Sequence, residues 1–221
     1  MIVVCASVKG GVGKSTIAVN LAVMRTMVGD RVLLIDGDQQ GTMSDWVLHR
    51  QNQGHPTTWT TVRHYGAASR PGVLKLKDNY DHVIIDAGGR DTQSLRAALS
   101  VADIALIPCP PRSFDLWSME QLASLVQDAR CVNSNLQAKA FINMGDSRSS
   151  DNEQSQAFLN EVDGIDMISV VIGQRKAFSN AAAEGLAVVE LKPKQSKAVA
   201  ELKELTACIF DVVMTTITHH Y

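Results

Sequence analysis

Short runs of consecutive apolar residues alternate along the chain with stretches in which apolar residues recur every three or four positions. A continuous apolar run is typical of a strand that is buried on both faces, whereas the three-to-four spacing is typical of a helix. The runs predict strands at 2–7, 31–35, 81–86, 103–108, 136–143 and 167–172, and the periodic stretches predict helices at 17–28, 95–101, 116–126, 153–162 and through 199–212. We therefore expect an α/β fold with a doubly wound, predominantly parallel sheet and helices on both faces, in one domain spanning 1–221.

The region from residue 42 to residue 80 has a weaker pattern. Residues 43–50 could form a short helix and residues 59–64 an edge strand, but three glycines and two prolines interrupt the rest. We expect loops and short elements beside the sheet here.

A glycine-rich segment separates the first predicted strand from the first predicted helix. Its sequence is Lys9-Gly10-Gly11-Val12-Gly13-Lys14-Ser15-Thr16. Glycines let the backbone approach an anion closely, and free amides at a helix N-terminus point at it. A phosphate loop of this kind would pair Lys14 with the β- and γ-phosphates and Ser15 with Mg²⁺. The alternative is a glycine-rich turn with incidental lysines; Val8 stands where the general pattern has its first glycine.

Carboxylates follow two further predicted strands. Asp36 and Asp38 come after the second strand, where open α/β sheets place their ligands. Asp86 ends the strand at 81–86, and a carboxylate in that position can reach the Mg²⁺ beside Ser15. The glycines that follow Asp86 suggest a turn that responds to nucleotide state. In each case the alternative is an aspartate that caps the next helix.

Composition narrows the picture only slightly. The 221 residues are 45% hydrophobic and 20% charged, with a formal net charge of −2, which neither supports nor excludes binding to DNA. The four cysteines are widely spaced and form no C-x-x-C pair, which fits a reducing cytoplasm and disfavours a metal or redox site. No apolar run approaches the length of a membrane span, so we expect no membrane association through one.

The presence of both Lys9 and Lys14 around the paired glycines resembles the deviant Walker A signature of the ParA/MinD family of ATPases. The segment from Asp36 to Gln40 is similar to the family's D-x-D-x-Q motif, and residues 173–185 look like its arginine-aromatic-alanine-glycine segment. The resemblance implies that Lys9 reaches the nucleotide of a partner subunit and that Asp38 orients the attacking water.

The same resemblance implies roles for several further residues. Asp36 would belong to the outer shell of the metal, Thr16 would contact the α-phosphate, and Asn143 would contact the base. The nucleotide-binding set is then Gly10, Gly11, Val12, Gly13, Lys14, Ser15, Thr16 and Asn143, and the metal set is Ser15, Asp36 and Asp86. Taken alone, Asn143 could equally be a turn residue at the end of a strand.

The function that this resemblance implies is Mg-dependent ATP hydrolysis coupled to formation of a homodimer, as in the short partition ATPases. An ATP-bound dimer would bind DNA nonspecifically on the nucleoid, and a centromere-binding adaptor would stimulate hydrolysis. Late basic residues could contact DNA if they share a face, although surface cations often serve only solvation: Arg175, Lys176, Lys192, Lys194 and Lys197.

Two other functions use the same loop. One is a spatial regulator of the Min or flagellar type that binds a membrane or a protein, although the last predicted helix has few cations in its second half. The other is a metabolic enzyme, either an ATP-dependent carboxylate ligase or an iron–sulfur reductase, and the absence of paired cysteines disfavours the reductase.

Overall fold

A single parallel sheet forms the centre of the molecule. The computed structural model describes residues 1–89, 92–111, 116–146, 150–193 and 195–210. Within these residues the sheet has seven strands in the order β3-β2-β4-β1-β5-β6-β7, and all neighbours are parallel. The strands are β1 (Ile2–Cys5), β2 (Val32–Gly37), β3 (Thr60–Arg63), β4 (His82–Ala87), β5 (Ile104–Cys109), β6 (Gln137–Gly145) and β7 (Asp166–Gly173).

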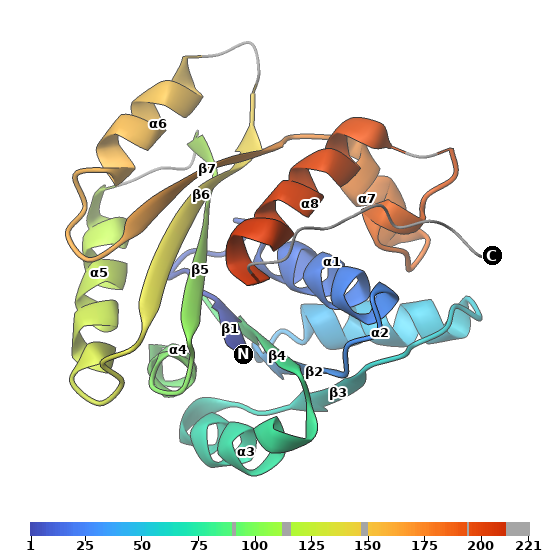
Figure 1. The fold of residues 1–221 in the computed structure, drawn as a ribbon, viewed down its shortest axis with the longest axis horizontal. Helices are drawn as coiled ribbons and strands as arrows, with labels where there is room; N and C mark the ends of the chain where they lie inside the picture. Colours follow the sequence, from blue (N-terminus) through green and yellow to red (C-terminus); the bar gives the residue numbers. More distant parts are fainter. Residues whose placement is uncertain (90–91, 112–115, 147–149, 194, 211–221) are drawn as a thin grey trace.

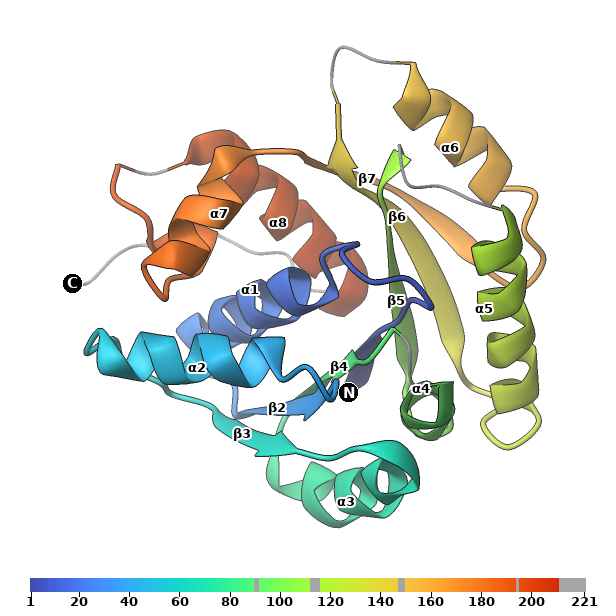
Figure 2. The same cartoon turned by 180° about the vertical axis from the view of Figure 1, so that it is seen from behind.

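Helices cover both faces of the sheet, as Figures 1 and 2 show from opposite sides. One face carries α1 (Lys14–Met27), α2 (Thr42–Asn52), α7 (Lys176–Ala183) and α8 (Ser196–Phe210). The other carries α3 (Ser69–Leu76), α4 (Thr92–Leu99), α5 (Leu116–Arg130) and α6 (Asp151–Leu159). The predicted doubly wound α/β fold is thus confirmed.

The two cores explain why the strands read as continuous apolar runs. Successive residues of a strand point to opposite faces, so Val3 and Cys5 pack under α1 and α8, while Ile2 and Val4 pack under α4 and α5. Every residue of β1 is buried. A parallel sheet with helices on both sides gives its central strands no polar face.

The region from 42 to 80 is more ordered than its sequence suggests. The short helix at 43–50 and the edge strand at 59–64 are confirmed as α2 and β3, with β3 at the edge of the sheet. The predicted loops around Pro71 contain the additional helix α3, in which Pro71 is the third residue. Proline is tolerated there because the first turn of a helix does not use its N–H groups for intrahelical bonds.

Some expectations about helix ends can be compared with the structure only in part. Helix α1 begins at Lys14, three residues before the periodic pattern becomes visible. Val212, at the end of the last predicted helix, lies outside the described residues.

A buried arginine joins α2 to the C-terminal part of the chain. The Arg50 side chain is 2% exposed and its Nη1 and Nη2 each donate to Glu190 at 2.7 Å. Its guanidinium also lies 5.6 Å and 5.2 Å from the ring centroids of Trp46 and Trp59. Nη1 further donates to the Gly185 carbonyl at 3.0 Å. A charge this deeply buried requires partners of this kind.

Two histidines extend this contact between α2 and the C-terminal end of α7. His49 Nε2 lies 2.9 Å from the Ala183 carbonyl oxygen, and His55 Nε2 lies 3.1 Å from that of Glu184. Helix C-termini leave their last carbonyls without intrahelical partners. Side chains from α2 and the turn after it therefore supply donors to three consecutive carbonyls at the end of α7.

Within the described part of the chain, no helix is long and apolar enough to cross a lipid bilayer.

Candidate functional site

The predicted phosphate loop lies in an open cleft at the carboxyl edge of the sheet. The cleft has a volume of about 720 Å³. The loop and the start of α1 form one side, and the segment between β2 and α2 forms the other. The lining residues are Gly10, Gly11, Gly13, Lys14, Ser15, Thr16, Asp38, Gln39, Gln40, Thr42, Gly89 and Met144. Segments 9–16 and 36–42, far apart in sequence, thus meet as expected for strands whose carboxyl ends share an edge.

Two positions in the loop require glycine. Gly11 and Gly13 have φ of 75° and 94°, a left-handed region that other residues rarely adopt. A Cβ at Gly13 would lie 2.4 Å from Asn143 Nδ2 and 3.3 Å from Met144 Cε. The Asn143 amide, itself 4% exposed, donates to the Val12 carbonyl at 2.7 Å. Asn143 therefore supports the loop through the Val12 carbonyl and packs against Gly13.

Lys14 is folded back into the loop. Its side chain is buried, and Nζ donates to the Lys9 carbonyl at 3.1 Å. Gly89, after β4, packs so closely that a Cβ there would lie 2.7 Å from the Lys9 carbonyl oxygen and 3.1 Å from Lys14 Nζ. The turn at 88–89 and the loop thus hold the Lys14 ammonium at the centre of the cleft, where it can meet an anion.

The carboxylates of Asp36 and Asp38 have different surroundings. Asp36 is fully buried, and both of its oxygens accept hydrogen bonds from the chain that follows. Asp38 lines the cleft, and its Oδ1 accepts from the Gln40 N–H at 3.0 Å. A Cβ at Gly88 would lie 3.3 Å from Asp38 Cα, so Asp38 sits directly against the turn that follows β4. The structure brings Asp38 to the cleft and Asp36 behind it.

Asp86 has the features of a cation ligand. It is fully buried, it is paired in register with Asp36 on the adjacent strand, and neither of its oxygens has a hydrogen-bond partner of standard geometry among the described residues. Burial raises the pKa of Asp86 to about 7, Ser15 and the Lys14 charge oppose that shift, and the negative charges of Asp36 and Asp38 add to it. An unsatisfied buried carboxylate beside a hydroxyl fits Mg²⁺, which prefers oxygen ligands. Ser15 and Asp86 are therefore the residues that could hold the metal.

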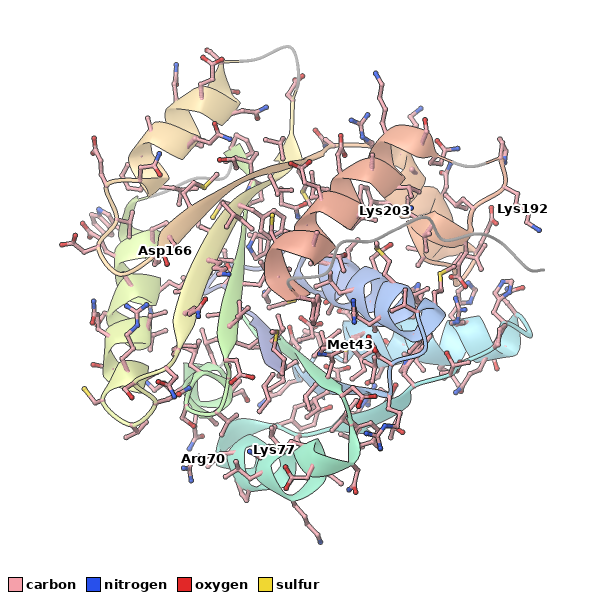
Figure 3. All side chains as sticks on the ribbon, in the orientation of Figure 1. Met43, Arg70, Lys77, Asp166, Lys192 and Lys203 are labelled. Atoms are coloured by element: carbon pink, nitrogen blue, oxygen red, sulfur yellow. The ribbon has the colours of Figure 1, made fainter. Side chains whose placement is uncertain are left out.

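The late basic residues are distributed over the C-terminal elements. Arg175 precedes α7 and pairs with Glu201 of α8, with its Nε 3.0 Å from Oε2, so its charge is partly neutralised. Lys192 and Lys197 are exposed, and Figure 3 shows Lys192 on the connection between α7 and α8. Lys176 is also exposed, at the start of α7, and Lys194 lies outside the described residues.

The sequence did not single out several residues that shape the site. Gln39 and Thr42 line the cleft beside Gln40, the glutamine of the D-x-D-x-Q motif, and Ser44 binds Asp36. Met144 also lines the cleft with a left-handed φ of 57°, which is rare for a residue with a Cβ. For Gln39, Thr42 and Ser44, a position within or just after the D-x-D-x-Q motif is a usable signal. For Met144 the sequence has none, because the conformation arises from the irregular pairing of β6 with β7.

Comparison with known proteins agrees with this geometry. The profile described as "CobQ/CobB/MinD/ParA nucleotide binding domain" matches residues 3–188. Among curated relatives, maintenance of carboxysome distribution protein A of Halothiobacillus neapolitanus is 28% identical over 202 residues, covering 90% of this chain and 92% of that protein. Protein ParA of Rhizobium radiobacter is 27% identical over 211 residues, covering 93% of each chain.

Solved structures show the same fold. A single-residue variant of Cyanothece McdA in a complex with ATP has a TM-score of 0.75 at 17% identity, covering 97% of this chain and 98% of that one. Cobyrinic acid a,c-diamide synthase of Mycobacterium smegmatis with bound ADP and magnesium has a TM-score of 0.71 at 20% identity, covering 99% of both chains. The cell division ATPase MinD of Pyrococcus furiosus has a TM-score of 0.69 at 21% identity, covering 94% and 97%.

Proposed function

Because the chain belongs to the CobQ/CobB/MinD/ParA nucleotide-binding family, we propose that it is a Mg-dependent ATPase that positions a cargo by ATP-controlled binding to DNA. The observation that carries this proposal is the cleft lined by Lys14 and Asp38, with the buried Asp86 carboxylate beside Ser15 and Lys14. ATP fits such a site because its phosphates need amides and an ammonium, and its metal needs a free carboxylate. Structures of the same fold with ATP, and with ADP and magnesium, support the choice of ligand.

The residues of the cleft divide the chemistry among them. The amides of Gly10, Gly11 and Gly13 and the Lys14 ammonium would neutralise the phosphate charge that develops in the transition state. Thr16 would contact the α-phosphate, and Asp38 would orient the attacking water.

Mg²⁺, when bound, would offset charge on the β- and γ-phosphates. Ser15 and Asp86 would hold it, with Asp36 behind them in its outer shell. Asn143 would hold the loop through Val12 and leave its amide oxygen for the base.

Lys9 supports a two-subunit version of this site. The Lys9 carbonyl accepts a hydrogen bond from the Lys14 ammonium, which fixes the Lys9 backbone next to the group that would bind the phosphates. The Lys9 side chain is half-buried, at the edge of the loop. A homodimer that brings two such edges together would present Lys9 to the partner's nucleotide. The exposed Lys192 and Lys197, with Lys176 and Arg175, would then contact DNA phosphates without reading sequence. Lys194 belongs to the same proposal.

Two substitutions test the nucleotide site. Lys14→Ala should weaken ATP binding by at least about 100-fold, since it removes the charge that faces the phosphates. Lys9→Ala should leave binding to the monomer within about twofold while lowering hydrolysis or ATP-dependent dimerisation, measured by light scattering. Normal hydrolysis by the Lys9 variant would show that the lysine has no role across the dimer.

Binding to DNA is tested by gel shifts on two unrelated duplexes, with ATP, with ADP and without nucleotide. The proposal expects binding in ATP alone, equal for both duplexes and weakened by salt. Equal binding in all three conditions would contradict it.

The cargo has two candidates. A partition protein would move plasmid or chromosomal DNA through a centromere-binding adaptor, and one relative, of Caulobacter vibrioides, is named a chromosome partitioning protein. A protein assembly is the second candidate, because another relative is named for carboxysome distribution. The protein encoded next to this one, tested for stimulation of ATP hydrolysis with and without candidate centromere DNA, separates the two.

Flotation with liposomes and ATP tests the alternative of a membrane-bound regulator of the Min type. A carboxylate ligase would instead show ATP consumption that depends on a small acid and an amine.

A further inference from the structure

The segment between β2 and α2 carries the residues of the cleft that face Lys14. Asp38, Gln39, Gln40 and Thr42 all line the cleft, and they span the turn into α2. The residue before this helix is Gly41, with a φ of 69° and no side chain that could cap the first N–H groups. The first turn of a helix needs acceptors for these groups. The geometry of the segment therefore depends on an acceptor from elsewhere.

Asp36 at the end of β2 is that acceptor. Its Oδ2 accepts from the Ser44 N–H at 2.9 Å and from the Ser44 hydroxyl at 2.5 Å, while its Oδ1 accepts from the Asp38 N–H at 3.1 Å. One buried carboxylate thus binds both ends of the segment. Ser44 supplies two of the three bonds, and its hydroxyl supplies the shortest of them.

Comparison with Asp86 shows how much these bonds orient Asp36. The two aspartates are register partners on adjacent strands, and both are fully buried. Among the residues that the structure describes, neither oxygen of Asp86 has a hydrogen-bond partner of standard geometry, whereas Asp36 is turned towards α2 by Ser44. A hydroxyl that donates to a carboxylate makes a short, directional bond. Without the Ser44 hydroxyl, the Asp36 carboxylate could rotate towards the nucleotide site and lose its hydrogen bond with the Asp38 N–H.

We propose that Ser44 is a positioning residue for hydrolysis, which through Asp36 fixes the backbone of residues 37–42 and with it the Asp38 carboxylate. This inference rests on the proposed ATPase function and adds to it a residue that does not line the cleft. Ser44 acts on the attacking water only through Asp36 and Asp38. Its loss therefore lowers the rate of turnover more than the affinity for nucleotide. Among the described residues the hydrogen bonds of Ser44 go to Asp36 and to none of the phosphate loop, Lys14 or Asp86, so these groups should keep their geometry.

The test compares three variants by steady-state hydrolysis with Mg²⁺ and duplex DNA. Ser44→Ala should lower kcat by about tenfold or more with KM for ATP within about twofold. Ser44→Thr should restore kcat to within about threefold, because its hydroxyl can donate to the same oxygen. Ser100→Ala is the matched control: it also removes a hydroxyl that makes a hydrogen bond, here to the Ala97 carbonyl at 2.8 Å, far from the cleft.

Hydrogen exchange on the nucleotide-free protein gives a readout that needs no activity. In Ser44→Ala the amides of residues 37–44 should exchange faster, and in Ser44→Thr they should not. A purely structural role would instead lower nucleotide affinity, melting temperature and kcat together, and would overturn the inference. So would an active wild type with an equally active Ser44→Ala variant. A wild-type protein that hydrolyses no ATP under any condition would overturn the proposed function as well.

Discussion

The buried pair of Arg50 and Glu190 allows a quantitative prediction about stability. Replacing Glu190 by glutamine keeps the shape of the side chain but removes its charge and one of its two acceptor oxygens. The carboxylate now accepts from Arg50 Nη1 and Nη2, both at 2.7 Å, and from the Ala187 N–H at 2.8 Å. In either orientation a glutamine amide group would face one of these donors. We expect Glu190→Gln to be strongly destabilising.

The size of the effect follows from burial. Removing one partner of a buried ion pair costs about 3–5 kcal/mol, because it leaves an uncompensated charge. The Glu190 side chain is 21% exposed, and Arg50 would retain its bonds to the Pro56 and Gly185 carbonyls, so the lower end of this range applies. A loss of about 3 kcal/mol corresponds to a fall in Tm of roughly 6–12 °C for a chain of this length.

Urea denaturation followed by circular dichroism measures this loss without nucleotide. Asp128→Asn is the matched control, because its partner Arg96 lies at 2.6 Å but both side chains are more than half exposed. An exposed pair contributes at most about 1 kcal/mol. If Glu190→Gln unfolds with the same free energy as the wild type, or as Asp128→Asn, the pair does not hold the two parts of the chain together and the reasoning is refuted.

Three further predictions concern the site and its supports. Gly13→Ala should abolish nucleotide binding, measured by fluorescence of a labelled ATP, because its Cβ would meet Asn143 at 2.4 Å; binding within twofold of wild type would contradict the geometry. Gly185→Ala should lower Tm, measured by calorimetry, since its Cβ would lie 2.7 Å from Arg50 Cα and φ is 68°. The raised pKa of Asp86, about 7, means that the nucleotide-free folded protein binds more protons than the unfolded chain between about pH 4 and 7. Its unfolding free energy should therefore fall as pH rises through that window, by at most about 4 kcal/mol, and Asp86→Asn should remove this dependence in urea titrations; an unchanged slope would refute it.

Much of the fold follows from local pattern because both faces of the sheet are covered. Six of the strands appear as continuous apolar runs or lie within two residues of them, and the edge strand β3, none of whose residues is buried, lies within the stretch 59–64 that the sequence suggests as an edge strand. Helix α3 escaped prediction because Pro71 and Gly72 read as breakers. Their position in the first turn, and the packing of the His64 ring against Gly72, are tertiary facts that no local pattern contains.

The residues of the site likewise fall into two groups: those that stand in sequence motifs and those that act through contacts in the folded chain. Lys14 and Asp38 stand in motifs whose spacing indicates their chemistry, and both line the cleft, while Asp86 at the end of β4 lies buried beside Ser15 and Lys14. Ser44 and Glu190 act on residues that are 8 and 140 positions away, through contacts that exist only in the folded chain. Side chains of this kind look like ordinary helix or turn residues in the sequence.

The contacts between α2 and the end of α7 also have a consequence for the order in which the protein is made. Arg50 leaves the ribosome 140 residues before Glu190, which at 5–20 residues per second is about 7–28 s. During that interval its guanidinium, together with His49 and His55, must remain hydrated, because the carbonyls of α7 do not yet exist. By the time Arg50 has emerged and for much of that interval, the nascent chain contains the phosphate loop and the Asp36–Asp38 motif. Helix α2 still lacks its packing partner, the C-terminal end of α7. We expect nucleotide added to stalled nascent chains to be retained only after residue 190 has emerged.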